Sequence, residues 1–303
     1  MNFTWLDDFL ALAASGNFSR AAEERHMTQP AFSRRIRALE QWLGAELFDR
    51  STQPARLTEA GEWFRGVAED LLGRVARLPG EARALAEASS ATLRLAATHA
   101  LSFTFLPAWL RSLEDRTTLG PVRLVSDVLQ HCEQLLLQRQ VQFALCHACA
   151  AAPGALDDAG GPAITVGSDL LLPVCAPGTG TRARHDLDAP RENARTPVLG
   201  YSAESGIGRI LAAAHGAALE KLQVQPVFTA HLASVLRTMA LDGRGVAWLP
   251  ASLVQDDLAQ GRLVAAGGER WQVRLEIRLY RDAERMSPAA EAFWKAASAA
   301  SSA

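Results

Sequence analysis

The sequence has little of several features that mark particular protein classes. Its 303 residues include four cysteines, too few for a disulfide framework. No window reaches the roughly 18 uninterrupted apolar residues that a transmembrane helix needs. The first residues lack a basic segment followed by an apolar run, so no secretory signal is expected. These absences exclude the disulfide-rich secreted and membrane-spanning classes, and a soluble cytoplasmic protein is the simplest expectation.

An excess of charge of one sign is also missing. The chain has 31 Lys and Arg against 33 Asp and Glu, a formal net charge of -2. This balance excludes a protein that coats nucleic acid by bulk positive charge, but it allows a local basic site. Lysine occurs only at Lys221 and Lys295, so arginine supplies the other basic residues. The forked guanidinium of arginine suits contacts with phosphate and guanine, although GC-rich coding bias also explains an arginine excess.

Residues 1–60 show the pattern of short helices followed by a small hairpin. Ser19 is predicted to cap a second helix, and Thr28 is predicted to cap a third. Pro30 is tolerated in the first turn of this third helix, and Gly44 is placed to end it. The predicted inner stripe of the third helix is Ala31, Ile36, Leu39 and Leu43. The residues left on its outer face are Ser33, Arg34 and Arg37.

A hairpin and a long helix are predicted next. Two short extended segments around a turn-rich link predict the hairpin over residues 47–57. Thr58 then caps a helix that is expected to reach about Ala88. Its apolar stripe is larger than one small domain can bury, so we expect it to pair with another chain. Pro79–Gly80 should kink or break it, because proline removes a helix hydrogen bond and clashes with the preceding turn.

The rest of the chain alternates strands with helices, which favours parallel sheets. The alternation repeats in two lobes, one over about 91–165 and 270–303, the other over about 166–269. Leu170–Cys175 and Trp271–Tyr280 are expected to be strands that cross between the lobes. This arrangement predicts a hinged cleft for a small ligand at the carboxyl ends of the strands.

The most specific pattern is FSRAAEERHMTQPAFSRRIRALE, at Phe18–Glu40. With Leu47–Arg50 and Leu57–Gly61, it resembles the winged helix-turn-helix and the start of the linker helix of LysR-type transcriptional regulators. The later order of elements is similar to that family's effector-binding domain. Gln29–Glu40 and Leu241–Pro250 are most similar to the branch that contains the hypochlorite-responsive regulator. The oxidant response of that branch is associated with methionines, of which this chain has four.

The resemblance implies an α+β multidomain protein. A winged helix-turn-helix is expected over residues 1–60, a dimerisation linker helix over 61–90, and a two-lobed α/β effector-binding domain, similar to periplasmic binding proteins, over 91–303. The implied function is sequence-specific binding to double-stranded promoter DNA, modulated by a small-molecule or oxidant signal. The implied assembly is a homodimer or a dimer of dimers, with RNA polymerase as a further candidate partner. No membrane, metal, cofactor or catalytic residue is implied.

The third helix carries side chains that suit base recognition. A recognition helix enters the major groove with its N-terminal residues at the base edges. Gln29 can pair with adenine, Arg34 with guanine, and Ser33 with a base or a phosphate. Pro30 can contact a thymine methyl group. The predicted DNA-binding residues are Ser19, Thr28, Gln29, Pro30, Ser33, Arg34, Arg37, Arg50 and Arg56.

The charges of the first 61 residues are arranged locally. Residues 25–37 contain four arginines and no acid, and residues 50–58 contain two arginines and no acid. The wing arginines are placed for phosphates or the minor groove. Asp8 is expected near the start of the first helix, where the helix dipole favours it. Arg37 faces either DNA or Glu40, which lies three residues further along the same helix.

By the resemblance, the effector contacts lie where strands meet helices. A hydroxyl near the exposed amides of a helix start can hold a carboxylate or another anion. His99 is either a ligand contact or a satisfied residue at a strand end. Arg209 either neutralises an anion or lies on a surface helix. The predicted effector-binding residues are Thr98, His99, Leu101, Ser102, Asp127, Tyr201, Ser202, Ser205, Val246 and Trp248.

An alternative interpretation starts from Cys146 and Cys149. With His131, Cys132 and Cys175 they suggest metal or redox chemistry, but a structural zinc site usually needs a second cysteine pair. A buried core thiol is the simpler reading of Cys146. The alternative function is a two-lobed small-molecule-binding protein or a redox sensor that uses Cys146 and Cys149. No enzyme signature is present, because no nucleophile-elbow or phosphate-loop pattern occurs.

Overall fold

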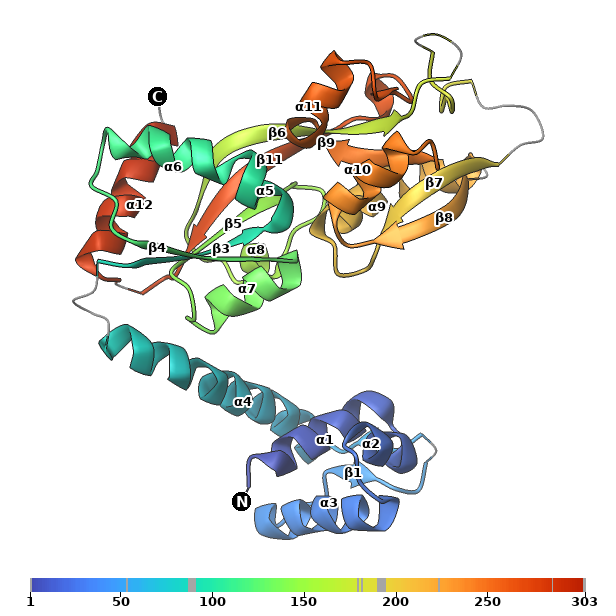
Figure 1. The fold of residues 1–303 in the computed structure, drawn as a ribbon. Helices are drawn as coiled ribbons and strands as arrows, with labels where there is room; N and C mark the ends of the chain where they lie inside the picture. Colours follow the sequence, from blue (N-terminus) through green and yellow to red (C-terminus); the bar gives the residue numbers. More distant parts are fainter. Residues whose placement is uncertain are drawn as a thin grey trace. The chain divides into compact units, whose positions relative to one another are not determined.

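The computed structural model describes residues 2–52, 54–86, 91–178, 180, 182–189, 195–222, 224–284 and 286–301. The chain forms two compact units, Met1–Pro79 and Gly80–Ala303 (Figure 1). The predicted end of the long helix near Ala88 lies outside the described residues. No described helix combines the length and the apolar character that crossing a bilayer requires.

The first unit contains short helices, a two-stranded hairpin and most of a long helix. Its core is built from side chains of every helix, including the fully buried Phe9, Phe32 and Leu39. Phe64 of the long helix packs edge-on against Phe9 at 5.0 Å, so the long helix is anchored in this core. The elements are α1 (Thr4–Ser15), α2 (Phe18–Glu24), α3 (Gln29–Leu43), β1 (Phe48–Asp49), β2 (Arg56–Leu57) and α4 (Glu59–Ala86).

Helix ends in this unit follow the sequence signals with two exceptions. Gly44 adopts φ +74° and ends α3 as predicted. Ser19 is not the cap of α2, because the Asn17 side chain accepts hydrogen bonds from the Ser19 and Arg20 amides. Thr28 precedes α3, but its side chain makes no capping hydrogen bond.

Two predictions about the helix interiors are corrected. In α3 the fully buried stripe is Phe32, Ile36 and Leu39, whereas Ala31 and Leu43 are only partly buried. Of the predicted kink or break at Pro79, the break does not occur, since α4 runs through this residue to Ala86. Thr58 does cap α4, because its hydroxyl accepts a hydrogen bond from the Gly61 amide at 3.0 Å.

The second unit is built on one mixed sheet with strand order β4-β3-β5-β11-β6-β9-β7-β8. Its first lobe comprises β3 (Leu93–Thr98), α5 (His99–Thr104), α6 (Leu106–Glu114), β4 (Val122–Asp127), α7 (Leu129–Leu137), β5 (Phe143–Ala148), α8 (Ala155–Asp158) and α12 (Pro288–Ser301). The second lobe comprises β7 (Thr196–Tyr201), α9 (Gly206–Lys221), β8 (Val224–Ala230), α10 (Ala233–Leu241), β9 (Val246–Pro250), α11 (Ala251–Ala259), β10 (Val264–Ala265) and a short 3-10 helix (Glu269–Trp271).

Two long strands connect the lobes, β6 (Ala163–Cys175) and β11 (Val273–Arg281) (Figure 1). They pair antiparallel with each other. On its other side, β6 pairs antiparallel with β9, and β11 pairs antiparallel with β5. The predicted crossing strands are therefore confirmed. Parallel pairing is right for β3 with β4 and β5, and for β7 with β8 and β9. It is wrong for the crossing strands, because a strand that leaves one lobe and a strand that returns run in opposite directions.

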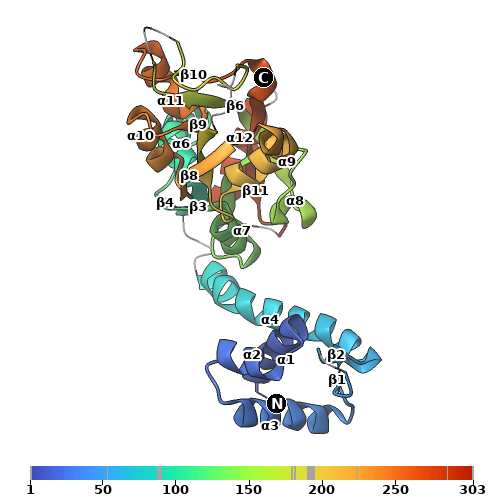
Figure 2. The same ribbon diagram turned by 90° about the vertical axis from the view of Figure 1, so that its right-hand side faces the viewer.

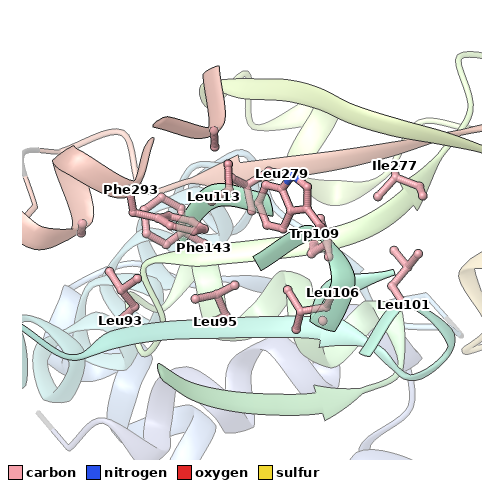
Figure 3. Packing of buried hydrophobic residues seen from close by; sticks show 14 residues of the cluster. Leu93, Leu95, Leu101, Leu106, Trp109, Leu113, Phe143, Ile277, Leu279 and Phe293 are labelled. Atoms are coloured by element: carbon pink, nitrogen blue, oxygen red, sulfur yellow. The ribbon is translucent and has the colours of Figure 1, made fainter. Parts of the chain in front are cut away.

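The first lobe has an aromatic core between its helices and the sheet. Phe143 of β5 packs against Phe293 of α12 at 4.9 Å, and Trp109 of α6 meets the same ring at 5.7 Å (Figure 3). On another side, α7 packs against β3, β5 and α8 (Figure 2). Because α7 is held by two strands, its first residues are fixed next to the ends of β3 and β4.

Candidate functional site

The first candidate site is the outer face of α3 together with the hairpin. Gln29, Pro30 and Arg34 are exposed, as are Arg37 and Arg56. A hollow beside α3 brings together five of the predicted residues, Ser19, Gln29, Ser33, Arg37 and Arg50. Thr28, Pro30, Arg34 and Arg56 do not line it. Sequence reasoning missed other polar residues of this hollow, Asn17, Arg20 and Thr52.

Glu40 fixes the hairpin to α3. Its carboxylate is buried and accepts hydrogen bonds from the Leu47 amide at 3.0 Å and the Phe48 amide at 3.4 Å. Arg50 donates to the other carboxylate oxygen at 2.5 Å and lies over the Phe18 ring. Of the two alternatives for Arg37, pairing with Glu40 is not the one observed, because the carboxylate points to the hairpin.

Asp8 is a second buried carboxylate that binds arginines. It is fully buried and accepts from Arg25 Nε at 2.9 Å and from Arg35 Nη1 at 3.0 Å. The expectation that Asp8 serves the dipole of its own helix is replaced by this bridge between three helices. Arg34 and Arg37 form no ion pair with a carboxylate in the part of the chain that the structure describes. Two of the four arginines over 25–37 thus hold the fold, and two remain on the outer face.

The second candidate site is a cavity of about 40 Å³ in the second unit. It lies at the carboxyl ends of β3, β4 and β5 and beside the end of β8, where the sequence predicts a ligand cleft. Its walls come from both lobes, because α5 and α7 begin on one side and α9 and α10 begin on the other. The lining residues are Thr98, His99, Ala100, Asp127, Val128, Leu129, His147, Ser205, Gly206, Ile207, His231 and Ala233.

Four of the predicted effector-binding residues line this cavity, Thr98, His99, Asp127 and Ser205. Leu101, Val246 and Trp248 are corrections, since their side chains are fully buried in the hydrophobic clusters of the two lobes. Leu101 lies in α5, and Val246 and Trp248 lie in β9. All three side chains point into a hydrophobic core rather than into the cavity.

The remaining predicted residues do not line the cavity either. Ser102 donates a hydrogen bond to Ser126 Oγ at 2.8 Å and lies close to the Thr98 carbonyl. The Tyr201 hydroxyl donates to the Trp248 carbonyl at 2.8 Å, so it joins β7 to β9. Ser202 lies in the turn before α9, outside the lining. The hydroxyls of Ser102 and Tyr201 thus join elements of the cavity walls, a role that strand-end position alone does not reveal.

Sequence reasoning missed two histidines of the cavity. His147 is the penultimate residue of β5 and is buried, and His231 follows β8 and is exposed. The rings of His99 and His231 face each other across the two lobes, with centroids 6.2 Å apart. The signal was available for His147, because β5 is parallel to β3 and ends at the same edge of the sheet. His231 follows β8, a strand of the second lobe, and lining by this residue depends on how the two lobes meet.

The charge of the cavity depends on a few titratable groups. Partial burial lowers the pKa of His99, an effect that Asp127 opposes and His231 reinforces. Burial opposes ionisation of Asp127, but hydrogen bonds from His131 Nδ1 and from the Val128 amide, both at 2.7 Å, outweigh it and lower its pKa. At neutral pH, Asp127 is therefore an anion that already has partners.

Arg209 does not line the cavity. It lies near Glu133, a buried residue of α7, and beside Gly154. Burial raises the pKa of Glu133, and the Arg209 charge opposes this shift. Of the two open interpretations, neutralisation of a cavity anion by Arg209 is therefore not supported.

The cysteine motif divides between two hydrophobic clusters. Cys146 packs beneath α7 with Cys132, whereas Cys149 packs against the core of the second lobe. A hydrogen bond with Cys132 and burial hold the pKa of the Cys146 thiol well above its usual range. Within the described ranges, no group of three or more His, Cys, Asp or Glu is arranged to hold a metal ion. The structure therefore favours a buried thiol over a Cys146–Cys149 pair.

Comparison with known families defines the class of protein. The family model described as bacterial regulatory helix-turn-helix protein, lysR family, matches residues 3–62. The family model of the LysR substrate binding domain matches residues 86–302. The chain belongs to the LysR family. It is a DNA-binding transcriptional regulator with an effector-binding domain, and members of this family are oligomeric.

Individual relatives cover almost the whole chain. The HTH-type transcriptional regulator YjiE of Escherichia coli is 32% identical over 96% of this chain and 92% of its own. DarR of Vibrio fischeri, solved in complex with DNA, is 30% identical with a TM-score of 0.57 and 98% coverage of each chain. HypT of Salmonella typhimurium, a hypochlorite-specific regulator, is 29% identical with a TM-score of 0.59 and covers 100% of this chain and 98% of its own. This likeness agrees with the predicted branch, although the sequence identity is no higher than that of DarR.

Proposed function

We propose that residues 1–60 read promoter DNA through α3 and contact its backbone through the hairpin. The observation that carries this proposal is the pair Arg34 and Arg37, exposed on α3 without a described carboxylate partner. Gln29 lies at the start of the same helix, where a recognition helix meets the bases. The other predicted contacts, Ser19, Thr28, Pro30, Ser33, Arg50 and Arg56, surround them. Arg50 contributes mainly by holding the hairpin through Glu40.

The test of DNA reading uses selection from a random duplex library with the full chain, followed by footprinting of the selected sequence. A single recurring sequence with a protected footprint supports the proposal. Recovery of unrelated sequences, with no protected region, contradicts it. When arginines of α3 are replaced in this test, Arg65→Ala is a suitable control variant, because Arg65 is an exposed arginine of α4 that pairs with Glu62.

The helix over residues 61–90 is assigned to dimerisation, and residues 91–303 to effector binding. Trp63, Leu71 and Leu78 of α4 are exposed large apolar side chains. Such a face on a long helix favours pairing with a second copy of the chain. Sedimentation of the wild type and of Trp63→Glu tests this assignment. A monomeric wild type contradicts it, and a shift of the variant toward monomer supports it.

A small molecule in the cavity is proposed to change how the dimers bind promoter DNA. The cavity spans both lobes, so a ligand that contacts both walls favours one arrangement of the lobes over another. The protein acts by binding rather than by catalysis, with the cytoplasm as its place of action and RNA polymerase as a candidate partner. A thermal-shift screen of metabolites and oxidants, repeated with the selected DNA, tests this. A compound that raises the melting temperature without changing DNA affinity contradicts the coupling.

A further inference from the structure

Three helices of eight residues or more begin at the cavity wall. The first residues of α7, α9 and α10 all line it, namely Leu129, Gly206 and Ala233. The N-terminus of a helix carries about half a positive charge and exposes amide donors. At α9 the Ser205 hydroxyl accepts from the Gly208 amide. Three such ends around one cavity favour a negatively charged ligand.

Buried polar atoms without partners also line the cavity. His147 has a side chain that is only 3% exposed, and its Nε2 lies at ion-pair distance, 3.5 Å, from Asp169 but forms no well-aligned hydrogen bond with a described residue. The buried Thr98 Oγ1 is likewise without a hydrogen-bond partner among the described residues. Buried polar atoms normally have a hydrogen-bond partner, and an atom without one destabilises the free protein. A polar ligand would supply the missing partners.

The positive charge available to such a ligand is titratable. No Arg or Lys is among the described residues that line the cavity, so its possible cations are His99, His147 and His231. Among the described residues, Asp127 is the only carboxylate of the lining, and it is bound by His131 and by a backbone amide. An ionised Asp127 opposes a second negative charge on the ligand, so a monoanion fits better than a dianion.

We propose that the effector is a compact monocarboxylic acid, bound as its carboxylate between His99 and His231 with uptake of a proton by this pair. The inference rests on the proposed function of the cavity and adds the class of ligand. The apolar residues of the lining, Ala100, Leu129 and Ile207, would contact the hydrocarbon part of such a ligand. The cavity volume of about 40 Å³, a few times the roughly 10–15 Å³ that one water needs, suits a small acid rather than a nucleotide.

Proton uptake follows from the geometry of the pair. Two imidazolium rings 6.2 Å apart repel each other, and a carboxylate between them removes the repulsion. The other titratable groups around the pair are Asp127 and His131, His147 with Asp169, and Glu204, which acts on His231. In the free protein, burial favours the neutral form of His99. Binding should therefore tighten as pH falls through the histidine range.

Isothermal titration calorimetry of the full chain tests the inference. Acetate, propionate and lactate are the probes, and acetamide, propionamide and lactamide are their uncharged counterparts. Measurements from about pH 6 to about pH 8, in two buffers of different ionisation enthalpy, count the protons taken up. We expect at least one carboxylate and no amide to bind. Near pH 8, binding should take up about one proton, and the affinity should fall about tenfold for each further pH unit.

The double variant His99→Gln/His231→Gln should lose proton uptake, whereas His215→Gln, which removes a histidine of α9 outside the lining, should keep it. The proton count of the wild type decides the question even when a variant does not fold. Affinity that is independent of pH, equal binding of the amides, or no binding of any carboxylate overturns the inference. If DNA selection and footprinting still succeed, only the ligand class has failed and the proposed function remains.

Discussion

Single arginines in the first unit have two distinct roles. Arg25 and Arg35 bind Asp8, and Arg50 binds Glu40, so these three join helices and hairpin. Arg34 and Arg37 point outward from α3 without such partners among the described residues. Removal of an outward arginine should change DNA recognition, whereas removal of a bridging arginine should change folding stability.

Arg34→Ala should therefore reduce discrimination at one base pair by about 1–3 kcal/mol. Arg56→Ala should instead weaken binding to all sequences and lower the salt slope by about one. Titrations with the selected duplex, single-base variants of it and random duplex at several salt concentrations separate the two effects. An equal loss on selected and random DNA for Arg34→Ala would falsify its assignment to base reading.

Asp257 is a buried acid whose ionisation should affect stability in acid. It is fully buried and is bound by Arg237 and Arg262. Burial opposes its ionisation, but the hydrogen bonds from both arginines outweigh this and leave the pKa below the usual value. Its contribution is thus complete above the unfolded pKa of about 4 and is lost as pH falls through the lower folded pKa.

Urea unfolding of wild type and Asp257→Asn measures this contribution. The difference in unfolding free energy should be constant above about pH 5 and shrink as the pH falls toward 2. Asp158→Asn is a control, because Asp158 ends the short helix α8 and makes no side-chain ion pair among the described residues. A difference for Asp257→Asn that grows in acid contradicts the assignment.

At the level of elements, the contact between α7 and α9 sets the closure of the cavity. A Cβ atom on Gly206 would lie 2.4 Å from Leu129 Cδ2 and 3.0 Å from Leu129 Cβ. The two residues come from different lobes, so this close approach requires glycine at the start of α9. Replacement by alanine must displace one helix start from the other.

Gly206→Ala should accordingly weaken binding of any cavity ligand by about tenfold, since Gly206 and Leu129 both line the cavity and small misplacements of such groups are costly. Gly216→Ala is the matched control in the same helix, where an added Cβ meets no described atom within 4 Å. That change should leave ligand binding intact and stabilise α9 by about 0.5–1 kcal/mol. Calorimetry with the carboxylate probes and thermal unfolding measure both effects. Equal ligand affinity in both variants argues against the contact.

Helices and strands were predicted best where the spacing of apolar residues and a residue that ends the element agree. The α3 helix, the hairpin and β3 follow from apolar spacing, Gly44 and the strand pattern, and the structure confirms them. The short helix α5 was missed because its six residues directly follow β3 and show no helical period of their own. Its position matters, since it turns His99 toward His231.

At the scale of the whole molecule, the two units have separate cores. Phe9 and Phe143 are both fully buried, one in each unit. Phe9→Ala should lower the stability of the first unit and Phe143→Ala that of the second, each by about 3–5 kcal/mol. Scanning calorimetry should show two transitions, of which each variant shifts one. A single transition that both variants shift equally contradicts independent unfolding.

The sequence by itself determined the family, the order of elements, the crossing strands and the exposed recognition face of α3. These depend on local periodicity and on a continuous motif, which a chain displays without folding. Tertiary structure alone decided which arginines bind Asp8 and Glu40, which strand-end residues face the cavity, and that His147 and His231 join His99. Those choices depend on side-chain direction and on contacts between residues far apart in sequence, and neither is encoded by spacing along the chain.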